Sequence, residues 1–166
     1  MKPKFKEIAE QGKTLMLKVA IFLIGFTVVG LCAFWLPWIG NVLHEMYPEF
    51  GYVKYPLLIG IYITTIPFFV ALYSGLKLLS NIDRNEAFSE SSVESLKYIT
   101  ICASTITLLY VFGIIILITV NAGNPGILLL GAVITFASIV IAVFAAVLQR
   151  LFKSAMALKT ENDLTV

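Results

Sequence analysis

The residues best suited to acid–base or metal chemistry gather in one short segment. His44 is the single histidine of the chain, and Glu45 and Glu49 are its nearest carboxylates. A zinc-protease helix needs a second histidine four residues after the first, so that both imidazoles lie on one helical face. Pro48 stands at that position. We therefore interpret the segment as a solvated polar face and predict no metal site.

Other catalytic groupings are missing from the sequence. It shows no serine-triad signature, no phosphate-binding glycine loop and no cysteine pair. Cys32 and Cys102 fall at different predicted depths in apolar helices, whereas a disulfide requires Cα atoms within about 7 Å. We expect a protein that is not an enzyme and that uses no cofactor.

Charge is confined to short segments between four long apolar stretches. No Asp, Glu, Lys or Arg occurs within residues 19–43, 56–76, 98–120 or 123–149. Each stretch has at least the roughly 20 residues that a helix needs to cross a bilayer core. The sequence predicts an all-α polytopic membrane protein, a single domain over residues 1–166. Its four transmembrane helices are expected at about 15–37, 56–79, 98–120 and 127–148.

The apolar stretches contain hydroxyl groups but no ionisable Asp, Glu, His, Lys or Arg. Ion-coupled transport usually employs such groups inside the membrane, where they are costly and therefore functional. Buried Ser and Thr more often form hydrogen bonds between helices or back to their own helix. A passive pore lined by hydroxyls stays open as an alternative, and it would require a homo-oligomer to enclose water.

The distribution of Lys and Arg predicts the orientation. Of 12 such residues, Lys54 alone falls in the connection between the first and second spans, and none falls between the third and fourth. Positive residues flank the cytoplasmic ends of transmembrane helices. Both termini and the Ser80–Ser95 loop are therefore expected in the cytoplasm, with Trp38–Tyr55 on the outer side.

Prolines mark the predicted ends of the first two spans. Pro37 is expected to end the first span, and residues 39–46 to form a short amphipathic interfacial helix in the first outer loop. Pro56 is expected in the first turn of the second span, where its missing donor costs nothing. Pro67 lies in the middle of that span and predicts a kink, with Thr64 and Thr65 bonding the freed carbonyl groups.

Two local patterns concern packing and caps. Ala142 and Ala146 follow Ser138 at four-residue intervals, a spacing that lets helix backbones approach in a membrane. Ser89 fits the N-cap of the third span, with Phe88 and Val93 as a hydrophobic staple. A capping box that begins at Ser91 competes with this assignment.

Two polar segments on the predicted cytoplasmic side are candidates for binding a soluble partner. The first is the loop with Asp83, Arg84 and Glu86. The alternative interpretation of this loop is a solvated turn without a binding role. The second is the C-terminus, where Leu164, Thr165 and Val166 place apolar residues beside the terminal carboxylate. A pocket or a sheet edge can capture such an end, although a plain polar tail is the simpler alternative.

With these elements placed, the chain resembles a bacterial family of small four-span membrane proteins catalogued as a domain of unknown function. The resemblance rests on Ala71-Leu72-Tyr73, Lys77-Leu78-Leu79-Ser80, Ile82-Asp83, Ala87-Phe88-Ser89, Phe136-Ala137-Ser138, Ala142 to Gln149 and Glu161 to Val166. It implies a multi-pass protein of the bacterial cytoplasmic membrane. Members are often encoded beside a small Cro/C1-type helix-turn-helix regulator, which implies that such a regulator is the partner.

The function expected from these observations is that of a non-enzymatic membrane regulator or sensor that acts with a cytoplasmic partner. The protein contacts the lipid bilayer. We expect no direct binding to nucleic acid, because the lysines flank apolar helices rather than forming a basic patch. The alternative is a small transporter, pore or immunity-type protein against a membrane-active toxin.

Overall fold

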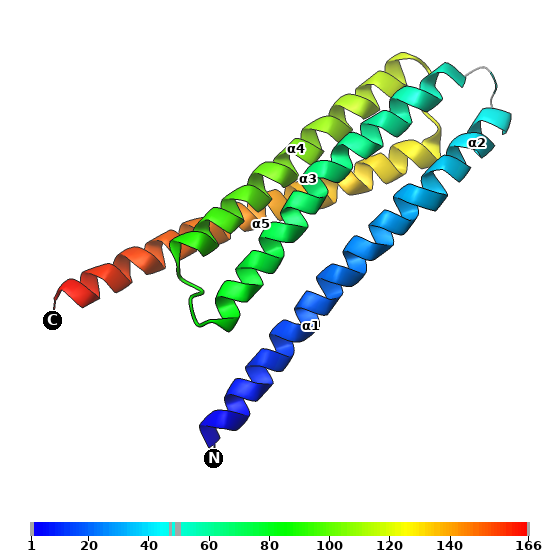
Figure 1. Ribbon diagram of the computed structural model, residues 1–166. Coiled ribbons are helices and arrows are strands. Elements are labelled where there is room, and N and C mark those ends of the chain that lie inside the picture. The colour runs from blue at the N-terminus through cyan, green and yellow to red at the C-terminus, as the bar shows by residue number, and fades with distance from the viewer. Residues whose placement is uncertain (1, 47, 49–50, 166) are drawn as a thin grey trace.

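The chain is helical throughout most of its length. The computed structural model describes residues 2–46, 48 and 51–165, with the backbone alone for 2–11, 13, 43, 44 and 46. Its elements are α1 (Lys2–Gly30), the π-helical turn η1 (Leu31–Trp35), α2 (Leu36–Met46), α3 (Gly51–Asp83), α4 (Glu90–Thr119) and α5 (Pro125–Leu164) (Figure 1). Four segments, Thr14–Val42, α3, α4 and α5, are long and apolar enough to cross a membrane. The predicted four-span, all-helical fold is confirmed.

The four spans form an open row rather than a closed bundle. The rod made of α1, η1 and α2 packs mainly on α3, and α4 packs between α3 and α5. Among the described residues, α1 and α5, the end members of the row, share no contact of comparable extent. In Figure 1 the blue rod accordingly lies along one side of the molecule.

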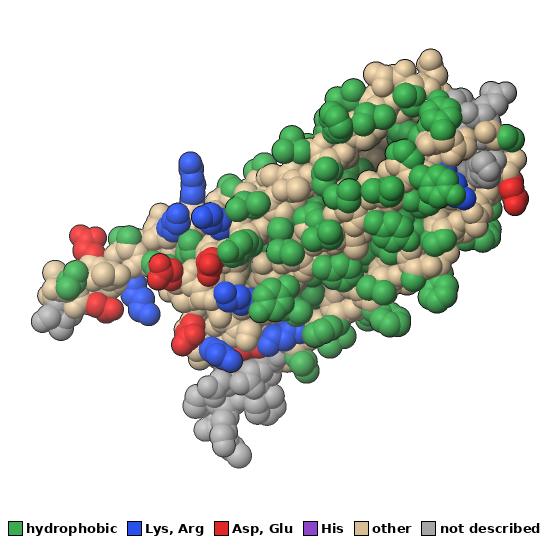
Figure 2. Space-filling model, turned by 45° about the horizontal axis from the view of Figure 1, so that its top comes forward, with side chains coloured by type: hydrophobic (Ala, Val, Ile, Leu, Met, Phe, Trp, Pro, Cys, Tyr) green, Lys and Arg blue, Asp and Glu red, His purple; other side chains and the backbone are tan. Residues whose placement is uncertain are grey.

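The two ends of the molecule differ in charge. Both termini and the α3–α4 loop lie at one end, which we call the terminal end (Figure 1). The end of α2, the start of α3 and the α4–α5 connection lie at the other, which we call the turn end. Figure 2 shows charged side chains gathered at the terminal end, an apolar middle, and few charges at the turn end. This is the pattern of a membrane protein whose ends meet water.

The best-packed region is the contact between α4 and α5. Gly131, Ser138 and Ala145 of α5 are all buried and recur every seven residues, which places them on one face of the helix. A Cβ atom at Gly131 would lie 3.2 Å from Ile114 of α4. The helices therefore approach as closely as small residues permit. The predicted packing residues Ala142 and Ala146 are half-buried and flank this face.

Pro37 does not interrupt the helical rod. The residues predicted to form a short interfacial helix lie in α2, which follows η1 directly and continues the rod (Figure 1). A proline inside an α-helix lacks a donor and crowds the preceding turn. Here the wider π turn η1 directly precedes α2 and accommodates Pro37.

The π turn leaves one carbonyl group that α3 satisfies. The Leu36 N–H donates to Leu31 O, five residues back. In the same register the Cys32 carbonyl would accept from Pro37, which has no N–H. The Tyr62 hydroxyl donates to Cys32 O at 2.7 Å, and the Thr65 hydroxyl lies 3.7 Å from the Cys32 thiol. This polar contact joins the rod to α3 at membrane depth.

Two expectations for α3 also need correction. Pro56 is not in the first turn, because α3 begins at Gly51 and contains both Pro56 and Pro67. The carbonyl freed by Pro67 belongs to Ile63, four residues earlier. Thr64 and Thr65 instead both donate to Ile61 O, at 2.7 and 3.0 Å. Their hydroxyls find a closer acceptor within their own turn.

Candidate functional site

The α3–α4 loop at the terminal end begins with an ordered helix cap. Glu86 N–H donates to Asn81 O at 2.9 Å, and Asn85 N–H donates to Ile82 O at 3.1 Å. Asn85 has a φ of 59°. These are the bonds of a Schellman motif, in which a left-handed residue, most often glycine and sometimes asparagine, ends the helix. The chain therefore leaves α3 in one defined direction.

The far side of the loop is held by Ser89 and Ser92. Ser89 has extended backbone and its hydroxyl accepts the Ser92 N–H at 3.3 Å, so its predicted role as N-cap of α4 is confirmed. Ser92 is fully buried. Its hydroxyl accepts from Asn81 Nδ2 at 3.2 Å and donates to Glu86 O at 3.4 Å. Both sides of the loop are thus fastened to one serine.

The loop is also joined to α5. The rings of Phe88 and Phe152 stack edge to face with centroids 5.1 Å apart, a favoured geometry for aromatic pairs. We expected Phe88 to form a staple with Val93. Val93 is buried at the start of α4, but the ring contact of Phe88 is with α5. The loop therefore links three helices.

A charged pair connects α1 to the same loop. Lys18 of α1 donates to Asp83, the last residue of α3, and both side chains are about one-quarter exposed. Asp83 lies past Lys77, outside the charge-free part of α3. The hydrogen bond from Lys18, reinforced by a bond from the Thr14 hydroxyl, outweighs desolvation and holds the pKa of Asp83 below its ordinary value. The carboxylate is thus ionised and tied to α1.

A second ion pair at this end is weaker. Lys77 of α3 and Glu94 of α4 lie 3.6 Å apart, and about half of each side chain is exposed. Exposed pairs of this kind contribute roughly 0–1 kcal/mol because solvent screens them. We therefore assign no functional weight to this pair.

The structure separates the predicted partner-binding residues. Asp83 faces α1, whereas Arg84 and Glu86 are exposed on the loop surface. Leu164 is 82% exposed and Thr165 caps the end of α5, which projects beyond the loop (Figure 1). Val166 lies outside the described residues. Loop and tail are two surfaces rather than one.

Sequence reasoning missed Lys18, Asn81 and Phe152 as site residues. Lys18 was counted only for orientation, although Thr14 and Lys18 lie four residues apart and thus on one face of α1. That polar pair at the border of an apolar stretch was the available signal. Nothing local indicated that Asn81 reaches Ser92 or that Phe152 reaches Phe88, because both contacts join different helices.

The part of the chain that the structure describes contains no cluster of side chains that could hold a metal ion. No three His, Cys, Asp or Glu side chains come together there. The side chain of His44 is not among the described ones, so its assignment as a solvated residue stays a prediction.

These features define the class: a polytopic, helical membrane protein with an ordered polar loop at its terminal end. The chain belongs to the family described as protein of unknown function (DUF2975), which matches residues 38–166. It is 50% identical over 155 residues to the uncharacterized membrane protein YoaS of Bacillus subtilis (strain 168), covering 92% of this chain and 97% of that protein. No solved structure matches the chain. The predicted family resemblance is confirmed.

Proposed function

We propose that this protein is a non-enzymatic membrane regulator in which the position of α1 is relayed to a soluble partner bound at the terminal end. One observation carries the proposal: Asp83, which pairs with Lys18, is the last residue of α3 and directly precedes the ordered α3–α4 loop. A shift of α1 would therefore act on the loop directly. Arg84 and Glu86, exposed on that loop, offer the partner charged contacts.

The terminal end is assigned to the cytoplasm of a bacterial cell, because all Lys and Arg residues except Lys54 flank it in the sequence. The partner is a small helix-turn-helix regulator, as the family resemblance implies. That regulator contacts DNA, whereas this chain contacts only the regulator.

Topology is tested by labelling intact cells with an impermeant thiol reagent. In a variant without Cys32 and Cys102, a cysteine introduced at Glu49 should react and one introduced at Glu86 should not. The reverse pattern would overturn the orientation and, with it, access of a cytoplasmic partner to the loop.

The relay is tested by reversing the charges of the Lys18–Asp83 pair. Lys18→Asp should repel Asp83 and release α1, whereas Lys18→Asp combined with Asp83→Lys should restore the pair. Release of α1 is measured with a short thiol crosslinker between Gly25→Cys and Leu72→Cys, since a Cβ at Gly25 would lie 3.5 Å from Leu72. Partner binding is measured by capture of the tagged protein from native membranes in mild detergent.

The expected result is that crosslinking, capture of a DNA-binding protein and control of that protein's target genes fall together in the single variant and recover together in the double variant. A single variant that loses crosslinking but keeps its partner and its transcriptional effect would contradict the relay. Solute flux through proteoliposomes of the purified protein would instead favour the alternative of a transporter or pore.

The two candidate partner surfaces are distinguished by separate variants. Deleting residues 161–166 should leave membrane insertion intact, because the apolar part of α5 ends before Arg150. Arg84→Glu with Glu86→Lys alters only the exposed loop. We expect both changes to reduce capture of the regulator; full capture by the truncated protein would leave the loop as the binding surface.

A further inference from the structure

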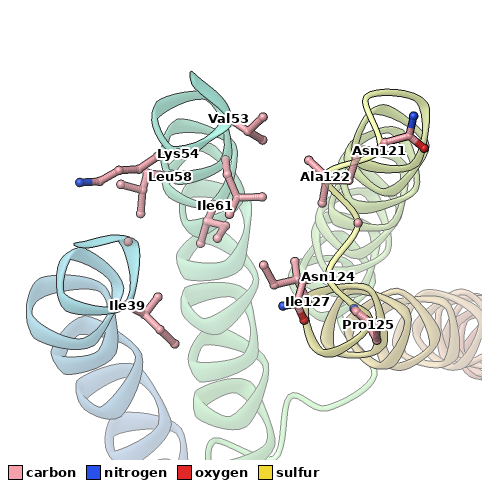
Figure 3. A pocket seen from close by; sticks show the side chains of 14 residues that line it. Ile39, Val53, Lys54, Leu58, Ile61, Asn121, Ala122, Asn124, Pro125 and Ile127 are labelled. Atoms are coloured by element: carbon pink, nitrogen blue, oxygen red, sulfur yellow. The ribbon is translucent and has the colours of Figure 1, made fainter. Parts of the chain in front are cut away.

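A pocket of about 270 Å³ opens at the turn end, away from the site described above (Figure 3). Aliphatic side chains of α2, α3, α4 and α5 form most of its wall, among them Ile39, Leu57, Ile61, Leu117 and Ile127. Its volume is just below that of typical ligand pockets, which run from roughly 300 to 1,000 Å³. Such a space accepts part of an apolar chain but not a whole lipid.

Polar groups border the pocket on the side of the α4–α5 turn. Asn124 Oδ1 accepts the Gly126 N–H at 2.9 Å, which leaves the Asn124 NH₂ group to donate elsewhere. Figure 3 shows the Asn124 side chain on the side of α5 that faces α3, and Ala122 directed toward α3 as well. The turn thus places a hydrogen-bond donor at the mouth of an apolar space.

A cation stands at the opposite border. The Lys54 stem lies against Gly40, with its Cε 3.4 Å from the position of a Cβ there. Its ammonium group donates to Asn41 Oδ1 at 2.7 Å and lies 5.7 Å from the centre of the Tyr55 ring. Both partners are neutral, and within the described residues no carboxylate pairs with Lys54.

We propose that this pocket binds an acyl chain of an anionic phospholipid, with the phosphate group at Lys54. The aliphatic wall matches the chain, the surrounding bilayer supplies it, and the Lys54 ammonium group matches a phosphate. Ile39 and Gly40 belong to the rod that includes α1, so an occupied pocket holds the rod against α3. The claim that the lipid binds here is independent of the proposed function. The further claim that its binding signals to the regulator rests on the proposed function.

The test uses the purified full chain in phosphatidylcholine nanodiscs, without any partner. A phosphatidylglycerol with a photoreactive diazirine on one acyl chain is added at a low fraction, and the labelled peptides are mapped. The same diazirine chain on phosphatidylcholine serves as the matched neutral probe. We expect labelling of residues 53–61 and 117–127, stronger for phosphatidylglycerol.

Ala122→Phe should fill the pocket and reduce that labelling to background, and Ala122→Leu should reduce it in part. Ala132→Phe, at an exposed position of α5 in the same half of the molecule, is the matched control and should label normally. Lys54→Gln should abolish the preference for phosphatidylglycerol, whereas Lys97→Gln at the terminal end should retain it.

Equal labelling of the Ala122 variants and the Ala132 variant would overturn the pocket as a lipid site. Equal labelling by both probes in the unaltered protein would overturn the role of the anionic headgroup. Normal lipid labelling with no captured regulator would leave the lipid site standing and remove the proposed function. The two proposals therefore fail separately.

Discussion

The α4–α5 contact and the α1–α3 contact hold two helix pairs by different means. Along α4 and α5, Gly131, Ser138 and Ala145 lie buried against a neighbour whose own Leu96 and Ala103 are buried. Along α1, Thr14 is the one buried residue among those described, and the apolar side chains that follow it are largely exposed. In lipid, apolar exposure costs little, so helices associate by close packing and polar contacts. The rod is therefore the part most easily moved.

The comparison predicts the largest loss of stability for overpacking the α4–α5 contact. Gly131→Leu should destabilise the fold by about 1–3 kcal/mol or more, because its side chain must displace Ile114. Gly60→Leu is the control, since a Cβ at Gly60 meets nothing within 4 Å. Thermal unfolding in detergent, followed by loss of the monodisperse species, measures both. Equal midpoints would contradict the close approach.

A smaller effect is expected at the polar contact between η1 and α3. Tyr62→Phe removes the donor to Cys32 O and should cost about 1 kcal/mol, the scale of hydrogen bonds between membrane helices. Pro37→Ala restores an N–H in the rod. We therefore expect Tyr62→Phe to cost less in a Pro37→Ala background than alone, measured as a double-mutant cycle. Additive effects would show that Pro37 and Tyr62 are not linked through that carbonyl.

The cap of α4 provides a local test. Ser89→Ala should cost about 1 kcal/mol, because the Ser92 N–H loses its side-chain acceptor. Ser91→Ala should cost less, since Ser95 bonds to the Ser91 carbonyl and not to its hydroxyl. Hydrogen exchange of the first turn of α4 reports both variants. Faster exchange in Ser91→Ala than in Ser89→Ala would favour the capping box instead.

The smallest effect near neutral pH concerns the Lys18–Asp83 pair. The pKa of Asp83 is lowered in the folded protein, so the stability it contributes is present above the ordinary aspartate range, roughly pH 4, and is lost only as the pH falls below it. Crosslinking between Gly25→Cys and Leu72→Cys is compared at each pH with crosslinking in the Asp83→Asn background, because thiol reactivity itself falls with pH in both proteins. The ratio should favour Asp83 and stay constant from pH 8 to about pH 5, and it should approach one below that range.

Span number, span type and the N-cap at Ser89 followed from the sequence, since each depends on residues close in the chain. A stretch without charge must form a helix in lipid because its backbone groups find no other partners. A serine that precedes a helix caps it through a bond within three residues. The corrections concerned prolines. Whether the helix stops at Pro37 or starts at Pro56 depends on the turn that precedes the proline and on a neighbour such as Tyr62.

By itself the sequence determined that this chain crosses a membrane four times with its charges at one end. The tertiary structure alone decided which helix is held loosely, that Lys18 meets Asp83, that Phe88 meets Phe152, and that a pocket lies beside Lys54. These contacts join residues far apart in the chain and depend on how the helices are ordered in the row. Four apolar helices can be arranged in several ways with the same hydropathy, because only close packing and a few polar groups distinguish the arrangements in lipid.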